Sequence, residues 1–323
     1  MNADRALGAL LGLACGDALG APAEFLNRST LQSQYGRLID MVGGGIWDPG
    51  EWTDDTAMAL CVAEGILAAP DDPVEEIGQR FLAWQTSGPK DVGSTISDAL
   101  RRFCGNWPEA ARSTDAARIG MAAGNGSLMR TLPVALAYAD PTTMLRQSAR
   151  ISAMTHWDPQ AEVGCAVYSL FARRLLRGES RLPAWRSALA DARTVAWAVD
   201  RDPAETPGVT PLPPAFWDRL EGIEDLDEAN LQPSGYAGYV LECLEAAVWW
   251  VIHAASFEDV LIGCVNLAGE ADTIAAVAGG VAGAHWGAAH IPERWLERLH
   301  SRARIEDVGR GLLRRRKVEM ALE

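Results

Sequence analysis

The arrangement of apolar and polar positions is helical nearly throughout this chain. Runs of helical length, rich in alanine and leucine, cover residues 57–69, 161–177, 239–255 and 274–288. Alternating runs of the kind that form strands are almost absent, and valine and isoleucine are dispersed. The pattern predicts an all-α protein with many helices and no well-defined sheet.

One long polar stretch, residues 200–234, interrupts this pattern with prolines and acidic side chains. Proline breaks regular elements, so we expect a surface excursion that holds one short helix at residues 216–220. No repeat or linker divides the chain, and residues 1–323 are therefore predicted to form a single domain. The basic run at residues 314–317 is predicted to lie on a solvated helix face.

Net charge, cysteine content and apolar segments limit the partners and the cellular compartment that we expect for this protein. The net charge is −14, and a surface of this sign repels the phosphates of long nucleic acids. Six scattered cysteines without a CxxC pair predict free, buried thiols in a reducing compartment. The start of the chain lacks the basic region of a signal peptide, and the apolar segments look too short or too rich in glycine and charge to span a membrane. We expect a cytoplasmic monomer that contacts no membrane.

Two acidic clusters, more than two hundred residues apart, carry the clearest chemical signal. Thr53-Asp54-Asp55-Thr56 and Glu270-Ala271-Asp272-Thr273 each place carboxylates and a hydroxyl at the start of an apolar helical run. Burying an unpaired carboxylate is costly, and neither cluster contains a basic residue. Oxygen ligands suit hard ions such as Mg²⁺ and Mn²⁺, although each cluster alone is also typical of an ordinary capped helix.

The second cluster opens a helix of very small side chains, which include Ala275, Ala276, Ala278, Gly279, Gly280, Ala282, Gly283 and Ala284. Glycine costs about 1 kcal/mol relative to alanine inside a helix. Several glycines together therefore predict that another helix approaches this backbone closely, which would place the acidic cluster deep in a cleft.

Three further segments hold polar groups in apolar or glycine-rich settings. Glu24 lies among apolar residues after the first helix, and His156 precedes a helix that starts with Pro159. Residues 124–127, Gly-Asn-Gly-Ser, let a backbone approach a ligand, and amides at a helix start hold phosphate. A surface glutamate, a packed histidine and a simple loop are the ordinary alternatives for the three.

Taken together and in order, these segments resemble the ADP-ribosylglycohydrolase family. The likeness covers nearly the whole chain, through residues 8–24 with Gly16-Asp17, then 52–56, 90–93, 124–130, 155–156, 238–240, 270–273 and 279–287. Each motif alone is weak, whereas the ordered set is specific.

The resemblance implies an all-α fold around two Mg²⁺ or Mn²⁺ ions. One ion would be held by Thr53, Asp54, Asp55 and Asp272. The second would be held by Glu24, Glu270, Asp272 and Thr273, with Asp272 bridging the pair.

The same resemblance implies a set of substrate-binding residues. The diphosphate and ribose would lie along Gly124, Asn125, Gly126, Ser127 and His156. Tyr239, next to Gly238, would pack near the adenine, and Asp91 matches a position close to the scissile sugar.

Glu270 departs from the family pattern, which commonly has aspartate there. The extra methylene moves the carboxylate by roughly 1 to 1.5 Å, judged from ordinary bond lengths. Magnesium requires near-ideal octahedral geometry, so Glu270 puts the second ion in question without affecting the fold.

The resemblance implies a hydrolase that removes ADP-ribose from mono-ADP-ribosylated protein side chains, with arginine the favoured attachment. Asp55 or Glu24 would act as base or acid beside an oxocarbenium-like transition state, and Asp91 would lie close to the sugar. One alternative is a module that binds ADP-ribose without turnover. Another is a hydrolase that releases ADP-ribose from a different conjugate, which would be ADP-ribosylated serine, O-acetyl-ADP-ribose or an ADP-ribosylated nucleic-acid end.

Overall fold

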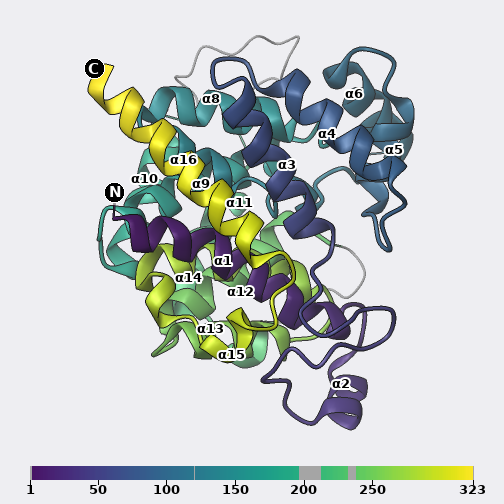
Figure 1. Ribbon diagram of the computed structural model, residues 1–323, viewed down its shortest axis with the longest axis vertical. Helices are drawn as coiled ribbons and strands as arrows, with labels where there is room; N and C mark the ends of the chain where they lie inside the picture. Colours follow the sequence, from purple (N-terminus) through teal and green to yellow (C-terminus); the bar gives the residue numbers. More distant parts are fainter. Residues whose placement is uncertain (1, 120, 196–211, 232–237, 323) are drawn as a thin grey trace.

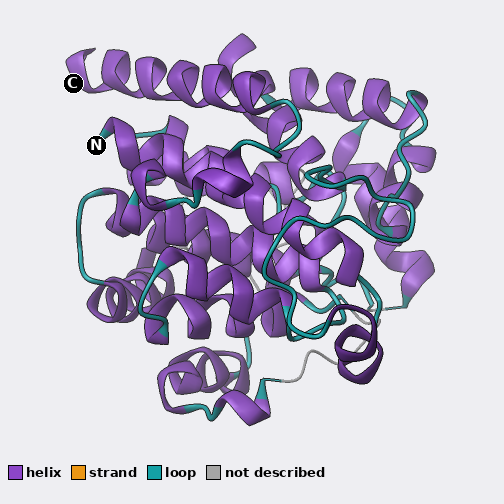
Figure 2. Ribbon diagram, turned by 60° about the horizontal axis from the view of Figure 1, so that its bottom comes forward, coloured by secondary structure: helices purple, strands orange, loops and turns teal. Residues whose placement is uncertain are grey.

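Helices form every regular element that the computed structural model describes, which comprises residues 2–119, 121–195, 212–231 and 238–322 (Figure 1; Figure 2). The predicted all-α class is confirmed. The helices in chain order are α1 (Ala3–Gly20), α2 (Arg28–Tyr35), α3 (Asp54–Ala68), α4 (Val74–Thr86), α5 (Ser94–Arg102), α6 (Trp107–Arg118), α7 (Leu132–Ala137), α8 (Pro141–Ser152), α9 (Pro159–Leu176), α10 (Arg181–Val195), α11 (Pro214–Glu221), α12 (Val240–His253), α13 (Phe257–Val265), α14 (Ala271–Trp286), α15 (Glu293–Leu296) and α16 (Arg302–Leu322).

The four apolar runs correspond to α3, α9, α12 and α14, and each helix begins within three residues of its predicted start. Local capping explains two of these starts. The Thr53 hydroxyl accepts a hydrogen bond from the Asp55 amide at 3.4 Å, and the Asp158 carboxylate accepts one from the Gln160 amide at 2.7 Å. These side chains satisfy amides that lack a partner within the helix.

Helices α1 and α14 run antiparallel at very close range, side by side through the core (Figure 1). A Cβ atom added to Gly12 would lie 2.3 Å from the Gly279 carbonyl oxygen, and one added to Gly16 would lie 2.0 Å from that of Ala275. Gly8 meets Gly283 in the same way one turn earlier. The predicted close approach is confirmed, and it brings the end of α1 to the start of α14.

This packing also explains the apolar composition of α1. Residues Ala3–Ala23 are long and apolar enough to cross a membrane, with a mean hydropathy of 1.4, so the expectation that every apolar segment falls short was wrong for this one. Within the fold, 94% of its apolar window is buried. The apolar composition of α1 is therefore explained by its burial against α14 and the neighbouring helices of the core.

The described part of the polar stretch, residues 212–231, contains the expected short helix as α11. Phe216, Trp217 and Leu220 are buried, and the Trp185 indole donates to the Leu220 carbonyl at 3.3 Å. The aromatic face of this part therefore packs on the core, while Pro213, Pro214 and residues 227–230 are exposed. Residues 200–211 and 232–234 of the predicted excursion lie outside the described residues.

The basic run in α16 differs in part from the expectation of a solvated face. Arg314 and Lys317 are exposed, but Arg316 is only 4% exposed. The Arg316 guanidinium donates to the carbonyl oxygens of Ala135 and Tyr138 at 2.7 and 2.8 Å. These carbonyls lie at the end of α7, where the helix leaves acceptors without an internal donor.

All six cysteines are free, as expected. Five of them are buried, and Cys104 is exposed. Burial raises the pKa of the Cys61 thiol to about 11, the direction expected for a protonated thiol packed in the core.

Candidate metal centre and ligand cavity

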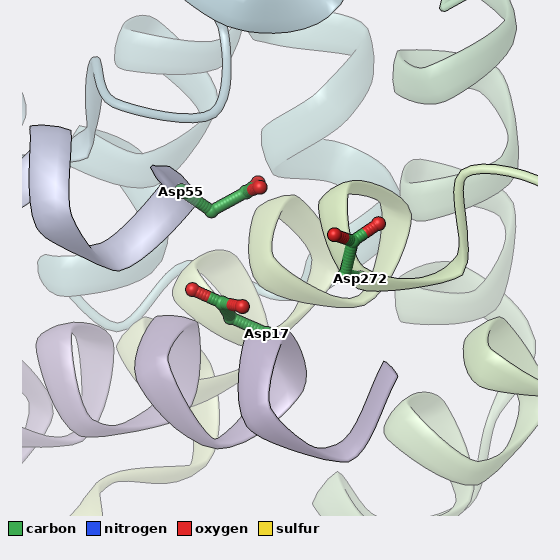
Figure 3. Close-up of side chains that lie close together, drawn as sticks. All are labelled: Asp17, Asp55 and Asp272. Carbon is green, nitrogen blue, oxygen red and sulfur yellow. The ribbon is translucent and has the colours of Figure 1, made fainter. Parts of the chain in front are cut away.

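Three helix ends bring three aspartates together. Asp17 comes from the last turn of α1, Asp55 from the first turn of α3 and Asp272 from the first turn of α14. One carboxylate oxygen from each lies within 4.8 Å of the others, and the side chains point toward one another (Figure 3). The close packing of α1 on α14 is what joins Asp17 to Asp272.

Hydroxyls from both acidic clusters complete this group. The Thr53 Oγ1 atom lies 3.2 Å from Asp55 Oδ2 and 3.5 Å from Asp272 Oδ2. The Thr273 hydroxyl donates to the same Asp55 oxygen at 3.3 Å. The structure thus places Thr53, Asp55, Asp272 and Thr273 around one buried point, although their separation in the sequence is long.

The electrostatics of this point favour a cation. Burial first, and then the charge of Asp272, raises the pKa of Asp55 well above the ordinary range. Burial first, and then the charge of Asp17, does the same to the pKa of Asp272. Oδ1 of each carboxylate is buried and has no hydrogen-bond partner within the described residues. Unpartnered buried anionic oxygens are costly, and an all-oxygen set of this kind fits a hard divalent ion. The residues present therefore fit the implied metal.

Asp54 and Asp55 face different directions, as adjacent helical residues do. Asp54 Oδ2 accepts a hydrogen bond from the Gly93 amide at 2.9 Å and turns toward Asp91 and the open cavity. Burial, followed by the charge of Asp91, raises the pKa of Asp54 to about 7. Burial, followed by the charge of Asp272, raises the pKa of Glu24 to about 11.

Asp17 differs from the other acids in its partners, and its position in the sequence indicated no role for it. Its Oδ1 accepts from the Thr53 amide at 2.9 Å. Its Oδ2 accepts from the Thr56 amide at 2.8 Å and from the Thr56 hydroxyl at 2.6 Å. Three protein donors thus occupy the Asp17 carboxylate, which holds the start of α3 in place. The only signal in the sequence was a charged residue inside an apolar, glycine-rich helix.

A cavity of about 390 Å³ opens beside the acidic group. Its lining brings together ten of the predicted site residues, which are Glu24, Asp54, Asp91, Gly124, Asn125, Gly126, His156, Gly238, Glu270 and Thr273. These residues come from segments spread over almost 250 positions, so only the tertiary structure assembles them.

Two predicted binding residues lie away from this cavity. Ser127 is buried, and its hydroxyl accepts a contact from the Cys165 thiol at 3.4 Å. The Tyr239 hydroxyl donates to Gln160 Oε1 at 2.5 Å, and its ring borders a smaller hollow shared with Gly238 and Glu270.

The glycine-rich loop is fixed to the segment before α12. The Asn125 amide donates to the Gly238 carbonyl at 2.7 Å, and the Val240 amide donates to the Ala123 carbonyl at 3.0 Å. The Asn125 side-chain amide also donates to Glu270 Oε2 at 3.3 Å. Glu270 makes no cap bond to α14, so its longer side chain reaches the loop instead.

Arg118 is a cavity residue that the sequence did not single out. Its guanidinium donates to Asp98 and to Ser94, both at 2.8 Å, which holds it at the wall. An arginine beside a glycine-rich loop suits an anionic ligand group. Its place at the end of an ordinary polar helix carried no distinguishing pattern.

Comparison with known proteins identifies the chain's relatives. The ADP-ribosylglycohydrolase family model matches residues 1–321. The ADP-ribosylarginine hydrolase Tri1 of Serratia proteamaculans (strain 568) is 31% identical over 326 residues, covering 96% of this chain and 79% of that protein. The ADP-ribosyl-[dinitrogen reductase] glycohydrolase of Rhodospirillum rubrum is 32% identical, covering 94% and 92%.

A solved structure named ADP-ribosylglycohydrolase-related protein complex superposes with a TM-score of 0.78 at 34% identity, covering 97% of this chain and 98% of that one. The fold, the ordered motifs and the full-length matches agree. The chain therefore belongs to the ADP-ribosylglycohydrolase family.

Proposed function

We propose that this protein is a divalent-metal-dependent hydrolase that removes ADP-ribose from mono-ADP-ribosylated proteins. One observation carries the proposal. Oxygens of Thr53, Asp55 and Asp272 converge on a buried point beside a cavity large enough for part of a nucleotide ligand, and two carboxylate oxygens there have no partner among the described residues. The residues that would hold the metal are Glu24, Thr53, Asp54, Asp55, Glu270, Asp272 and Thr273.

A divalent ion bound at this group would supply Lewis-acid chemistry by lowering the pKa of a water and orienting sugar hydroxyls. The protein's own groups do the rest. Asp91 and Glu24 line the cavity and present oxygens to an oxocarbenium-like sugar. Glu24 and Asp55 are the candidates for moving the proton between water and leaving group, because both combine burial with a raised pKa.

The acidic walls support arginine as the attachment site. Glu24, Asp91 and Glu270 surround the cavity, and a guanidinium linkage carries positive charge that these carboxylates attract. A serine linkage is neutral and gains less from them. The relative from Serratia proteamaculans bears the name of an ADP-ribosylarginine hydrolase, which agrees with this choice. The free thiols support a cytoplasmic setting.

A panel of ADP-ribosylated arginine and serine peptides and O-acetyl-ADP-ribose, each with Mg²⁺, Mn²⁺ or EDTA, tests the proposal. We expect release of ADP-ribose from the arginine peptide only with metal. Asp55→Ala and Asp272→Ala are expected to abolish release while keeping the helical circular-dichroism spectrum. Turnover that survives chelation would contradict the proposal.

Calorimetry with ADP-ribose separates this hydrolase from a binding module. Tight binding of ADP-ribose without turnover of any conjugate would favour the module. The two acidic clusters retain the hydroxyls of Thr53 and Thr273 and three aspartates, which a binding module without metal chemistry does not require.

A further inference from the structure

His156 lies between the cavity and a buried arginine. Its Nδ1 atom is 2.8 Å from the Thr155 hydroxyl oxygen, and Arg130 Nη2 donates to that same oxygen at 2.7 Å. Arg130 and Thr155 are both 0% exposed, and His156 is 1% exposed. These three residues form a continuous chain of hydrogen bonds from the core to the cavity wall.

The direction of the middle hydrogen bond follows from what each group is able to donate. A guanidinium has donors only, so the Thr155 oxygen acts as acceptor toward Arg130. Within the described residues, the remaining partner of that oxygen is His156 Nδ1. A buried hydroxyl hydrogen without an acceptor is costly, so the hydroxyl donates to Nδ1. Nδ1 is therefore an acceptor, and the ring proton of a neutral His156 lies on Nε2.

The doubly protonated ring is disfavoured by its surroundings. Burial first, and then the charges of Arg130 and Arg118, lower the pKa of His156 well below its ordinary range. Arg130 has no ion pair within the described residues, and its other neighbours are the Ile151 carbonyl, the Met58 thioether and the Phe81 ring. Its positive charge therefore acts on the imidazole without a carboxylate in direct contact within the described residues.

The Nε2 side of the ring faces the glycine-rich loop. A Cβ atom added to Gly124 would lie 3.1 Å from Nε2, and one added to Gly126 would lie 3.2 Å from it. Both glycines and His156 line the cavity. Nε2 has no hydrogen-bond partner among the described residues, so its proton is available at the loop.

We propose that Thr155 and Arg130 are positioning residues that hold His156 as the Nε2–H tautomer, so that the cavity presents a fixed hydrogen-bond donor to an acceptor oxygen of the ligand. This proposal rests on the proposed function for the identity of the ligand, whose diphosphate and ribose carry such oxygens. With the opposite tautomer, Nε2 would direct a lone pair at the same oxygen and repel it.

Nitrogen-15 spectra of the histidine rings in the metal-free, ligand-free protein test the tautomer directly. His156→Gln identifies the signal among the five histidines. We expect the proton of wild-type His156 on Nε2. Thr155→Val keeps the side-chain shape but lacks the hydroxyl. In this variant we expect a fraction of the molecules to carry the His156 ring proton on Nδ1 instead of Nε2. Thr155→Ser should restore the wild-type spectrum.

Arg130→Met tests the other end of the chain. Without the guanidinium, the Ile151 carbonyl loses its donor and becomes available to the Thr155 hydroxyl, so His156 Nδ1 is expected to gain a share of the proton. Because Arg130→Met leaves the Thr155 hydroxyl in place, it should shift the His156 tautomer populations less than Thr155→Val does.

Titration with ADP-ribose provides the functional readout. Thr155→Val should weaken ADP-ribose binding by about threefold to tenfold, the effect expected from disturbing one ordinary hydrogen bond, and Thr155→Ser should restore it. Thr114→Val is the matched control, because Thr114 is equally buried but donates to the Ala110 carbonyl inside α6. It should change neither the ring spectrum nor the affinity.

The outcomes separate the two proposals. A wild-type spectrum with the proton on Nδ1, or an unchanged spectrum in Thr155→Val, would overturn the positioning role whatever the binding result. Failure of the wild type to bind ADP-ribose or release it from any conjugate would overturn the proposed function, while an Nε2–H spectrum would still support the hydrogen-bond chain. If Thr155→Val fails to fold, the wild-type spectrum and Arg130→Met decide.

Discussion

The carboxylate of Glu270 accepts a hydrogen bond of 3.3 Å from the side-chain amide of Asn125, which joins the start of α14 to the glycine-rich loop. Glu270 stands where the family resemblance led us to expect aspartate, and its longer side chain reaches Asn125. Glu270 therefore connects the two parts of the site. It stands two positions before Asp272 of the metal group, and its side chain contacts the glycine-rich loop through Asn125.

Glu270→Asp is expected to separate these two functions. The shorter side chain no longer reaches Asn125, so ADP-ribose binding should weaken by about tenfold through loss of a charge-assisted hydrogen bond. Magnesium affinity should rise, because an aspartate fits the tight octahedral geometry of Mg²⁺ better. Separate calorimetric titrations with Mg²⁺ and ADP-ribose measure both changes. Asn125→Ala is the matched control and should lower only the ADP-ribose affinity. Weaker magnesium binding in Glu270→Asp would contradict the prediction.

Asp17→Asn and Asp55→Asn should have opposite effects on the metal-free protein. The asparagine amide offers one acceptor oxygen where Asp17 uses two, so at least one donor at the start of α3 loses its partner. We expect the free energy of unfolding to fall by about 1–3 kcal/mol. Asp55→Asn removes a repelling charge from the acidic group and should leave stability unchanged or higher. Urea unfolding without metal compares them, and equal losses would show that Asp17 is merely another member of the repelling group.

The stability gained from metal should increase with pH. Burial raises the pKa of Asp17 to about 6, and burial with Asp91 raises that of Asp54 to about 7. Carboxyls in the unfolded chain lose their protons near pH 4, so between about pH 4 and pH 7 these two groups bind more protons in the native state. Their contribution to the free energy of unfolding therefore falls as pH rises in the metal-free protein.

A bound ion offsets this loss, because it requires deprotonated ligands. The difference in melting temperature with and without Mn²⁺ is expected to grow across about pH 5 to pH 8. Asp272→Ala is the control and should show little shift from Mn²⁺ at any pH. A metal-induced shift of constant size over this range would argue against coupled protonation of the acidic group.

Gly12→Ala should destabilise the fold from within the α1–α14 contact. The added Cβ would lie 2.3 Å from the Gly279 carbonyl oxygen, which is backbone and has no rotamer to change. We expect a loss of about 2–3 kcal/mol in the free energy of unfolding, despite the better helix propensity of alanine. Gly222→Ala is the control, since its Cβ would meet no atom within 4 Å. Equal thermal midpoints for the two variants would contradict the close packing.

The sequence by itself determined the helical class and the places of α3, α9, α12 and α14. Helical periodicity and capping depend on residues three or four positions apart, which a single chain displays directly. It also placed both acidic clusters at helix starts and predicted a close neighbour for the glycines of α14. These features have local causes, and the structure shows each of them.

Only the tertiary structure decided which distant groups meet. The identity of α1 as the neighbour of α14 depends on a match of glycines at both surfaces. The partners of Asp17 depend on the packing of the end of α1 against the start of α3. The contact of Glu270 with Asn125, the burial of Arg316 and the chain from Arg130 to His156 are likewise invisible in the order of residues. A buried polar group must find its partner wherever packing brings one, and packing joins helices without regard to their separation along the chain.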